Sequence, residues 1–150
     1  MMSERESVLV LPASIHDAMV AHCLRESPLE ACGILGGVEP MVSAFHPLRN
    51  ASASESHYDA DPRDLIDAVL SIRANGGEML AIYHSHPKWQ PIPSQVDLRE
   101  NYYGPLPRII VSLMGATPEV RVWRLDPDSY EELPWRVVPD EPAEPLKPTT

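Results

Sequence analysis

The segment EMLAIYHSHP, from Glu78 to Pro87, places the strongest constraint on the fold. It begins as an apolar run of strand length and becomes polar at its C-terminal end, where a proline removes a backbone donor and stops the strand. Segments with helical and with extended hydrophobic patterns are interleaved on both sides of it, and the later strands are joined by short turns. The sequence therefore predicts an α/β protein with a mixed β-sheet.

Hydrophobic spacing and the residues that start and stop helices predict the individual elements. A first helix is expected between Ser14, acting as its cap, and Pro28. A second is expected between Asp61, also a cap, and Gly76. The remaining expected elements are strands at residues 7–12, 29–37, 41–48, 78–87, 108–114, 119–125 and 130–138, a short helix at 94–102, and a polar loop at 49–60 that could be mobile.

Length and composition indicate one globular domain. The chain has 150 residues, of which 43% are hydrophobic and 23% charged, enough for a sizeable core. We expect the domain to cover residues 1–138 and the proline-rich, acidic tail, 139–150, to be disordered. Neither a membrane-spanning apolar segment nor a secretory signal pattern is recognisable, so a cytoplasmic protein without membrane contact is expected.

The charge distribution argues against nucleic-acid binding. The net charge is −10, and the 12 lysine and arginine residues do not cluster, whereas affinity for nucleic acid depends largely on neutralising phosphates. The two cysteines, Cys23 and Cys32, form neither a C-x-x-C pair nor a disulfide framework. Buried, reduced packing is the favoured role for both, and Cys32 as a nucleophile is the weaker alternative.

The two histidines at the end of the strand 78–87 are candidate metal ligands. Side chains alternate along a strand, so His84 and His86 share one face, with Cα atoms about 6.5–7 Å apart. Imidazole nitrogens at this spacing can converge on one metal ion. Taken alone, two surface histidines would explain the pattern as well.

A third ligand is expected from the segment that follows. A catalytic zinc site has three protein ligands and an open position for water. Asp97 is the candidate, because Ser94 and Asp97 have the spacing of a helix cap and its third residue, and Pro91 and Pro93 stiffen the returning loop. A plain capping box would account for Ser94 and Asp97 without any metal.

A zinc-activated water also needs a base, and Glu30 is the candidate. It lies where a helix has ended and an apolar strand begins, a position where a carboxylate is costly unless it has a partner or a task.

These residues together resemble the signature of the JAMM metalloproteases, also called the MPN-plus domain. The signature contains a glutamate, then His-Ser/Thr-His-Pro, then Ser-x-x-Asp after six residues. Here it reads Glu30, HSHP at 84–87, and SQVD at 94–97. The resemblance extends over residues 8–126 and is closest to the compact stand-alone bacterial members. It implies a curved mixed β-sheet flanked by helices, similar to the cytidine deaminase fold, although the deaminases' own H-x-E and P-C-x-x-C pattern is missing.

The resemblance also implies roles for the site residues. His84, His86 and Asp97 would bind Zn²⁺. Glu30 would act as general base and then as general acid, and Ser94 would donate a hydrogen bond to the oxyanion. Ser85 is expected to pack or to support the ligands. Trp89, in the loop beside the site, could close over a substrate, but packing is slightly favoured.

The activity implied is hydrolysis of the peptide or isopeptide bond after the C-terminal Gly-Gly of a ubiquitin-like protein, with a β-grasp sulfur carrier as the expected partner. A non-catalytic MPN-type scaffold that binds partners is the alternative. A zinc hydrolase acting on a cell-wall or phage-type peptide is a third interpretation. The carrier, the type of bond and the oligomeric state stay open at this level.

Overall fold

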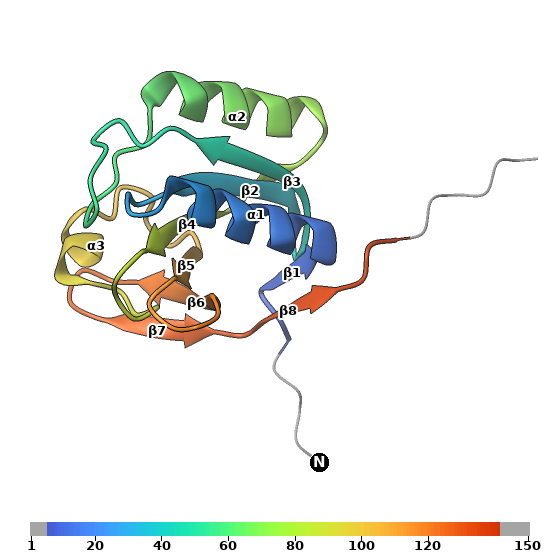
Figure 1. The fold of residues 1–150 in the computed structure, drawn as a ribbon. Coiled ribbons are helices and arrows are strands. Elements are labelled where there is room, and N and C mark those ends of the chain that lie inside the picture. The colour runs from blue at the N-terminus through green and yellow to red at the C-terminus, as the bar shows by residue number, and fades with distance from the viewer. Residues whose placement is uncertain (1–5, 142–150) are drawn as a thin grey trace, which may run out of the picture.

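A computed structural model describes residues 6–141 of the chain. These residues form eight strands and three helices. The strands make up one mixed sheet, and helices pack against it (Figure 1). The predicted α/β fold with a curved mixed sheet is confirmed. In chain order the elements are β1 (Leu9–Pro12), α1 (Ala13–Glu26), β2 (Cys32–Val38), β3 (Met41–Leu48), α2 (Pro62–Ala74), β4 (Glu78–His86), α3 (Gln95–Arg99), β5 (Arg108–Ser112), β6 (Glu119–Leu125), β7 (Tyr130–Leu133) and β8 (Trp135–Val138).

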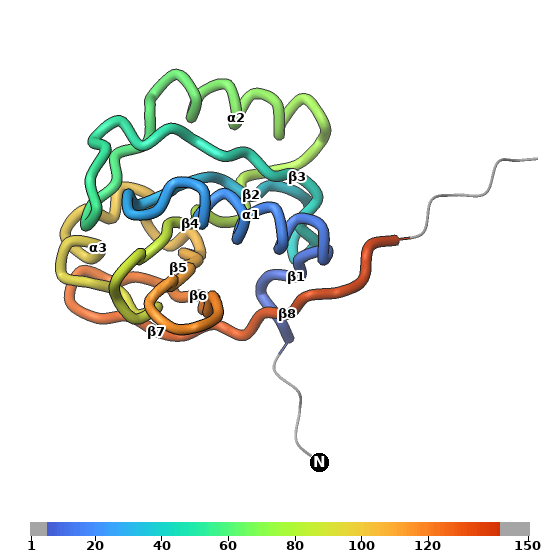
Figure 2. The backbone as a smooth tube through the Cα atoms, viewed as in Figure 1, coloured from blue at the N-terminus to red at the C-terminus, as the bar shows by residue number. Residues whose placement is uncertain are grey.

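The sheet has the strand order β7-β6-β5-β4-β2-β3-β1-β8. Strand β4 lies near its centre, antiparallel to β2 and parallel to β5. The strands at the two ends of this order, β7 and β8, are consecutive in the chain and are separated by Pro134 alone. The sheet must therefore curve strongly, and the tube in Figure 2 shows β1 and β8 lying side by side where the chain returns.

The two long helices pack on opposite faces of the sheet, as the alternation of strand side chains requires. Helix α1 contributes Met19 and Cys23 to a core that contains Leu35 and Tyr83. Helix α2 contributes Ala68 and Ile72 to a second core that contains Cys32 and Ile34. Because Cys32 pairs with His84 in the sheet register, His84 lies on the face covered by α2.

Gly33 is required by a close approach within the sheet. A Cβ atom at this position would lie 2.2 Å from Cε2 of Tyr83. The Tyr83 hydroxyl in turn lies 2.6 Å from Nδ1 of the buried His22 on α1. The glycine leaves room for the ring that joins the helix to the strand carrying the metal-ligand candidates.

Three expectations about helix and strand ends are wrong. Asp61 directly precedes α2, but its side chain makes no capping hydrogen bond. Helix α1 begins at Ala13, and the side chain of Ser14 does not cap it, because its N–H and hydroxyl both donate to Asp140. The expected strand 130–138 is two strands, which Pro134 divides: β7 pairs with β6, whereas β8 pairs with β1. A proline lacks the N–H that a continuous ladder needs.

The tail expected at 139–150 lies mostly outside the described residues, so its disorder and the domain boundary stay predictions. Within residues 6–141, no helix has the length and apolar character needed to cross a membrane.

Candidate metal centre

The end of β4 brings two imidazole rings together. His84 and His86 are both buried on the same face of the sheet, and their Nε2 atoms lie 3.1 Å apart. Both neighbours of β4 hold this end in place, since His84 pairs with Cys32 of β2 and with Ile110 of β5. The pairing on both sides thus fixes the backbone that carries the two nitrogen donors.

The third candidate donor arrives on α3. Ser94 caps this helix by accepting a hydrogen bond from the Asp97 N–H at 3.0 Å, and the Ser94 N–H donates to Oδ2 of Asp97 at 2.9 Å. This box turns the carboxylate towards β4, where Oδ1 lies 3.1 Å from Nε2 of His84 and Oδ2 lies 3.1 Å from Nε2 of His86. The expected capping box and the expected cluster are one arrangement, in which the three candidate ligand atoms lie within 4.8 Å of one another.

The protonation states within this cluster favour a cation at its centre. Although burial by itself raises the pKa of Asp97, the rings of His84 and His86 hold that pKa far below its usual range, so the carboxylate is ionised. Burial lowers the pKa of His84, so its ring is neutral. Nδ1 of His86 lies 2.7 Å from the carbonyl oxygen of Gln90, a contact that needs an N–H. In the neutral ring Nε2 then presents a lone pair to the other acceptors.

With the ring protons on Nδ1, the three side chains present acceptor atoms to one point, where a cation offsets their mutual repulsion. Two imidazole nitrogens and one carboxylate oxygen form a donor set that suits Zn²⁺ and other divalent transition metals. The residues present therefore fit a metal ion.

Glu30 lies just before β2, beside the cluster. It is 3% exposed, and its Oε1 atom has no hydrogen-bond partner within residues 6–141. Burial, followed by the charges of Asp97 and Glu100, raises the pKa of Glu30 to about 9. A buried carboxyl group with a free oxygen is unsuited to a structural role and available for proton transfer.

A cavity joins this carboxyl group to the cluster. Its volume is about 280 Å³, and Glu30, His86, Ser94 and Trp89 are among the residues that line it. The favoured prediction that Trp89 packs is wrong: the side chain is 63% exposed and also lines a neighbouring, more open groove together with Met114. The indole therefore lies at the surface, beside both the cavity and the groove.

Ser85 and the cysteines behave as structural residues. The Ser85 hydroxyl, on the opposite face of β4 from the histidines, accepts a hydrogen bond at 2.8 Å from the N–H of Ala31, the neighbour of Glu30. Burial raises the pKa of the Cys23 and Cys32 thiols to about 12. Protonated, buried thiols are poor nucleophiles, which supports packing as their role.

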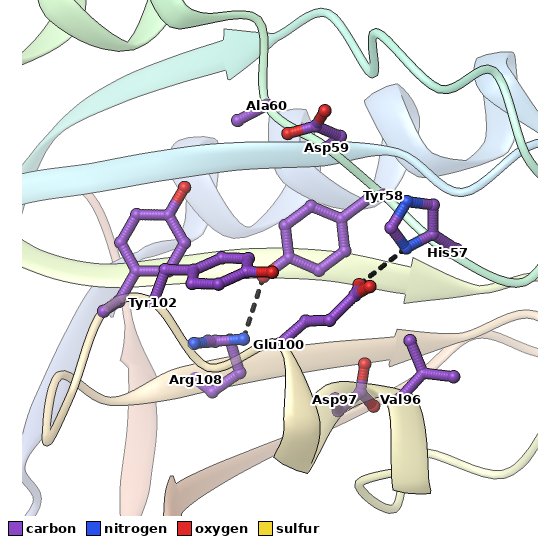
Figure 3. Close-up of a pocket in the computed structure, with 10 residues that line it drawn as sticks. His57, Tyr58, Asp59, Ala60, Val96, Asp97, Glu100, Tyr102 and Arg108 are labelled. Atoms are coloured by element: carbon purple, nitrogen blue, oxygen red, sulfur yellow. Dashed lines mark hydrogen bonds and ion pairs between the residues drawn. The ribbon is translucent and has the colours of Figure 1, made fainter.

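Three further residues lie around the site that the sequence alone did not indicate. Asn50 donates through Nδ2 to the carbonyl oxygens of Glu30 at 2.9 Å and of His57 at 3.1 Å, which fixes the loop 49–60 against the base. Figure 3 shows the other two: Arg108 donates to the hydroxyl of Tyr58 at 2.8 Å inside a polar pocket of about 270 Å³ that reaches Asp97. The only sequence signal was the arginine that opens the apolar segment RIIVSL.

The sequence matches the family described as prokaryotic homologs of the JAB domain over residues 12–126. This match covers more than half of the chain and agrees with the resemblance found in the motif.

Among curated relatives, a protein of Thermus thermophilus named probable TtuB-protein conjugate cleaving protease is 39% identical over 94 residues, covering 62% of this chain and 63% of that one. The aligned part thus spans somewhat less than two thirds of that relative. A desampylase of Haloferax volcanii is 33% identical, with 61% of this chain and 70% of the relative covered. A CysO-cysteine peptidase of Mycobacterium tuberculosis is 31% identical over 134 residues, with 87% and 92% covered.

Solved structures show the same fold. A protein of Desulfitobacterium hafniense superposes with a TM-score of 0.81 at 31% identity, covering 88% of this chain and 94% of its own. A JAB1/MPN domain protein of Archaeoglobus fulgidus superposes with a TM-score of 0.59 at 17% identity, covering 89% and 99%. At that identity the second likeness concerns the fold alone.

Proposed function

The chain belongs to the family of prokaryotic homologs of the JAB domain, and we propose that it is a zinc-dependent peptidase that cleaves after the C-terminal Gly-Gly of a ubiquitin-like β-grasp protein. The observation that carries this proposal is the pairing of two features in one cavity. A cluster of two imidazoles and a carboxylate, His84, His86 and Asp97, lies beside the buried carboxyl group of Glu30, whose Oε1 atom has no hydrogen-bond partner within residues 6–141.

His84, His86 and Asp97 are the proposed ligands of Zn²⁺. A zinc ion held by them supplies Lewis-acid chemistry, since it acidifies a water molecule and polarises the scissile carbonyl group.

Glu30 moves the proton. Its Oε1 atom accepts the proton of the attacking water and then delivers it to the nitrogen of the leaving amine. Without a metal ion, the pKa of about 9 would leave Glu30 protonated at neutral pH. The positive charge of a bound metal ion would lower this pKa, so that the carboxylate can accept the proton, while its burial favours returning the proton to the amine. Enclosure in a cavity of about 280 Å³ limits competing bulk water.

Ser94 is the proposed hydrogen-bond donor to the oxyanion. Its Oγ atom already accepts the Asp97 N–H, so its own O–H proton is free to be donated elsewhere. It lines the same cavity as Glu30, and a fixed donor in such a position stabilises the developing charge.

The substrate class follows from the names of the relatives, which refer to a TtuB-protein conjugate, to desampylation and to CysO-cysteine. Each name supports cleavage of a bond to a protein of the ubiquitin-like kind. A tail ending in Gly-Gly is thin and extended, which suits an approach past Trp89 into a narrow cavity. The proposal covers cleavage of either a peptide or an isopeptide bond.

The test is intact-mass spectrometry of a β-grasp sulfur carrier that bears a short extension after Gly-Gly, incubated with the zinc-loaded wild type, with Glu30→Ala and with Glu39→Ala. Glu39 is an exposed glutamate in the β2–β3 turn and serves as the matched control. We expect the wild type and Glu39→Ala to release the extension and Glu30→Ala to leave the carrier intact while retaining one zinc per chain. Zinc binding by all three proteins without cleavage of either an extended carrier or an isopeptide conjugate would favour the scaffold alternative.

A further inference from the structure

The two histidines of the cluster differ in what holds the ring nitrogen that faces away from it. Nδ1 of His86 is hydrogen-bonded to the carbonyl oxygen of Gln90 at 2.7 Å. Nδ1 of His84 is buried and has no hydrogen-bond partner within residues 6–141. A histidine that binds a metal ordinarily donates its other N–H to an acceptor, which fixes the rotation of the ring. Some other contact must do this for His84.

An aromatic ring lies against His84 in place of that acceptor. The ring of Tyr58 is stacked on it, with centroids 4.8 Å apart and planes inclined by 23°, whereas the ring of His86 lies at 4.9 Å and is tilted by 58°. A near-parallel stack restricts rotation about the Cβ–Cγ bond, because turning the imidazole would drive its edge into the neighbouring face.

Tyr58 is itself fixed from the sheet. Its hydroxyl accepts a hydrogen bond at 2.8 Å from Nη1 of Arg108, and Nη2 of the same arginine donates at 2.8 Å to the side-chain oxygen of Asn101. The guanidinium also lies 5.3 Å from the ring centroid of Tyr103. A guanidinium that is almost fully buried and held by neutral oxygen atoms is costly, and its retention requires a specific task.

The sheet register explains why this arginine can reach the tyrosine. Arg108 pairs with Ile82, and His84 pairs with Ile110, so Arg108 and His84 project from the same face of two neighbouring parallel strands. Tyr58 comes from the loop 49–60 and bridges the two side chains. Figure 3 shows its hydroxyl directed towards Arg108.

We propose that Tyr58, anchored by Arg108, is a positioning residue that fixes the ring of His84 for metal binding in place of the usual hydrogen bond to Nδ1. This inference rests on the metal site of the proposed function and assigns to the loop 49–60 a part in that site. An exclusively structural role would tie the loop to the sheet without affecting the ligand, so metal affinity separates the two interpretations.

The test is a Co²⁺ titration followed by visible absorption, together with Zn²⁺ competition against a chelator, on the full chain. Tyr58→Leu removes the stacked ring, Tyr58→Phe keeps the ring and removes only the hydroxyl, and Tyr102→Leu alters an exposed tyrosine of the same pocket. We expect Tyr58→Leu to weaken binding of both ions by about 10- to 100-fold and to change the Co²⁺ spectrum. Tyr58→Phe should restore affinity to within about 3-fold, and Tyr102→Leu should behave as the wild type.

Thermal unfolding of each variant in chelator reports the structural cost separately. Tyr58→Met, which keeps apolar volume without a flat ring, serves if Tyr58→Leu does not fold, with the same expected loss. Wild-type affinity and an unchanged Co²⁺ spectrum in Tyr58→Leu or Tyr58→Met would overturn this inference alone. Failure of the wild type to bind either ion would overturn the proposed function as well.

Discussion

The candidate metal centre has a strand-borne half, His84 and His86 at the end of β4, and a loop-borne half, Glu30, Ser94 and Asp97 in the segments around it. The strand-borne half is held by ladders to β2 and β5 on both sides. The loop-borne half depends on a few individual hydrogen bonds, such as those of the Ser94–Asp97 box. A change in the backbone position of the strand-borne half therefore requires a change in the sheet. In the loop-borne half, the position of a side chain depends on single hydrogen bonds.

We therefore expect the geometry of the proposed site to be altered most easily in the segments that the fewest hydrogen bonds hold in place. Glu30 illustrates the point: its N–H donates to the carbonyl oxygen of Ser54 and its carbonyl oxygen accepts from Asn50, so the loop 49–60 holds this proposed base. Single substitutions can separate the contributions of the two halves, and the largest effect is expected at Asp97.

Asp97→Ala should have the largest effect, because this one carboxylate is both a proposed ligand and half of the α3 capping box. We expect zinc affinity, measured by chelator competition, to fall by at least about 100-fold. Asp67→Ala, at an exposed position of α2, is the control and should bind as the wild type. Unchanged zinc content in Asp97→Ala would move the third ligand elsewhere.

Glu30→Gln should stabilise the metal-free protein at neutral and alkaline pH. The folded pKa of about 9 lies above the unfolded value near 4.5, so the wild type binds more protons when folded and loses stability as pH rises between these values. By pH 7 this loss amounts to about 3 kcal/mol of unfolding free energy, which the neutral amide avoids.

Urea unfolding in chelator at pH 5 and pH 8 measures this effect. The wild type and the control Glu39→Gln should be clearly less stable at pH 8, and Glu30→Gln should show a much smaller change. Equal pH dependence in all three proteins would mean that Glu30 titrates normally and that its environment is more hydrated than its burial indicates.

Asn50→Ala should cost about 1–3 kcal/mol of unfolding free energy, because it removes the side-chain donor to the Glu30 carbonyl oxygen and the acceptor of the Asp59 N–H. Turnover should fall by more than zinc affinity, since Asn50 bonds Glu30 directly and reaches His84 only through the neighbours of Tyr58. Asn75→Ala, at an exposed helix end, is the control. A parallel loss of zinc would show that the two halves are not separable in this way.

Ser94→Ala should have the smallest effect on folding, about 1 kcal/mol, the usual cost of a lost helix cap. Zinc affinity should fall far less than in Asp97→Ala. Ser94→Thr keeps the hydroxyl and should recover most of the stability in thermal unfolding. If Ser94→Ala lost as much zinc affinity as Asp97→Ala, Ser94 would have to position α3 by more than its capping hydrogen bond.

The sequence predicted the local parts of the site and missed the contacts between distant segments. His84 and His86 share a face because strands alternate, and the Ser94–Asp97 box is encoded in four residues, so both could be read directly. Arg108 and His84 share a face because β4 and β5 are parallel neighbours, and Tyr58 reaches both from a loop distant in sequence, so no local pattern contains that information. The proline itself was a local signal for the split at Pro134, whereas the pairing of β8 with β1, at the other end of the chain, was not encoded locally.

The single proline between β7 and β8 has a consequence for self-association. Unpaired strand edges are templates on which other copies of a chain can add, and a sheet of eight strands would ordinarily offer two of them. Here both edge strands are four residues long and carry charged side chains, Glu131 and Glu132 on β7 and Arg136 on β8. Neither edge strand in the described part of the chain is long, flat and apolar, and the sheet is curved. Both features disfavour edge-to-edge aggregation.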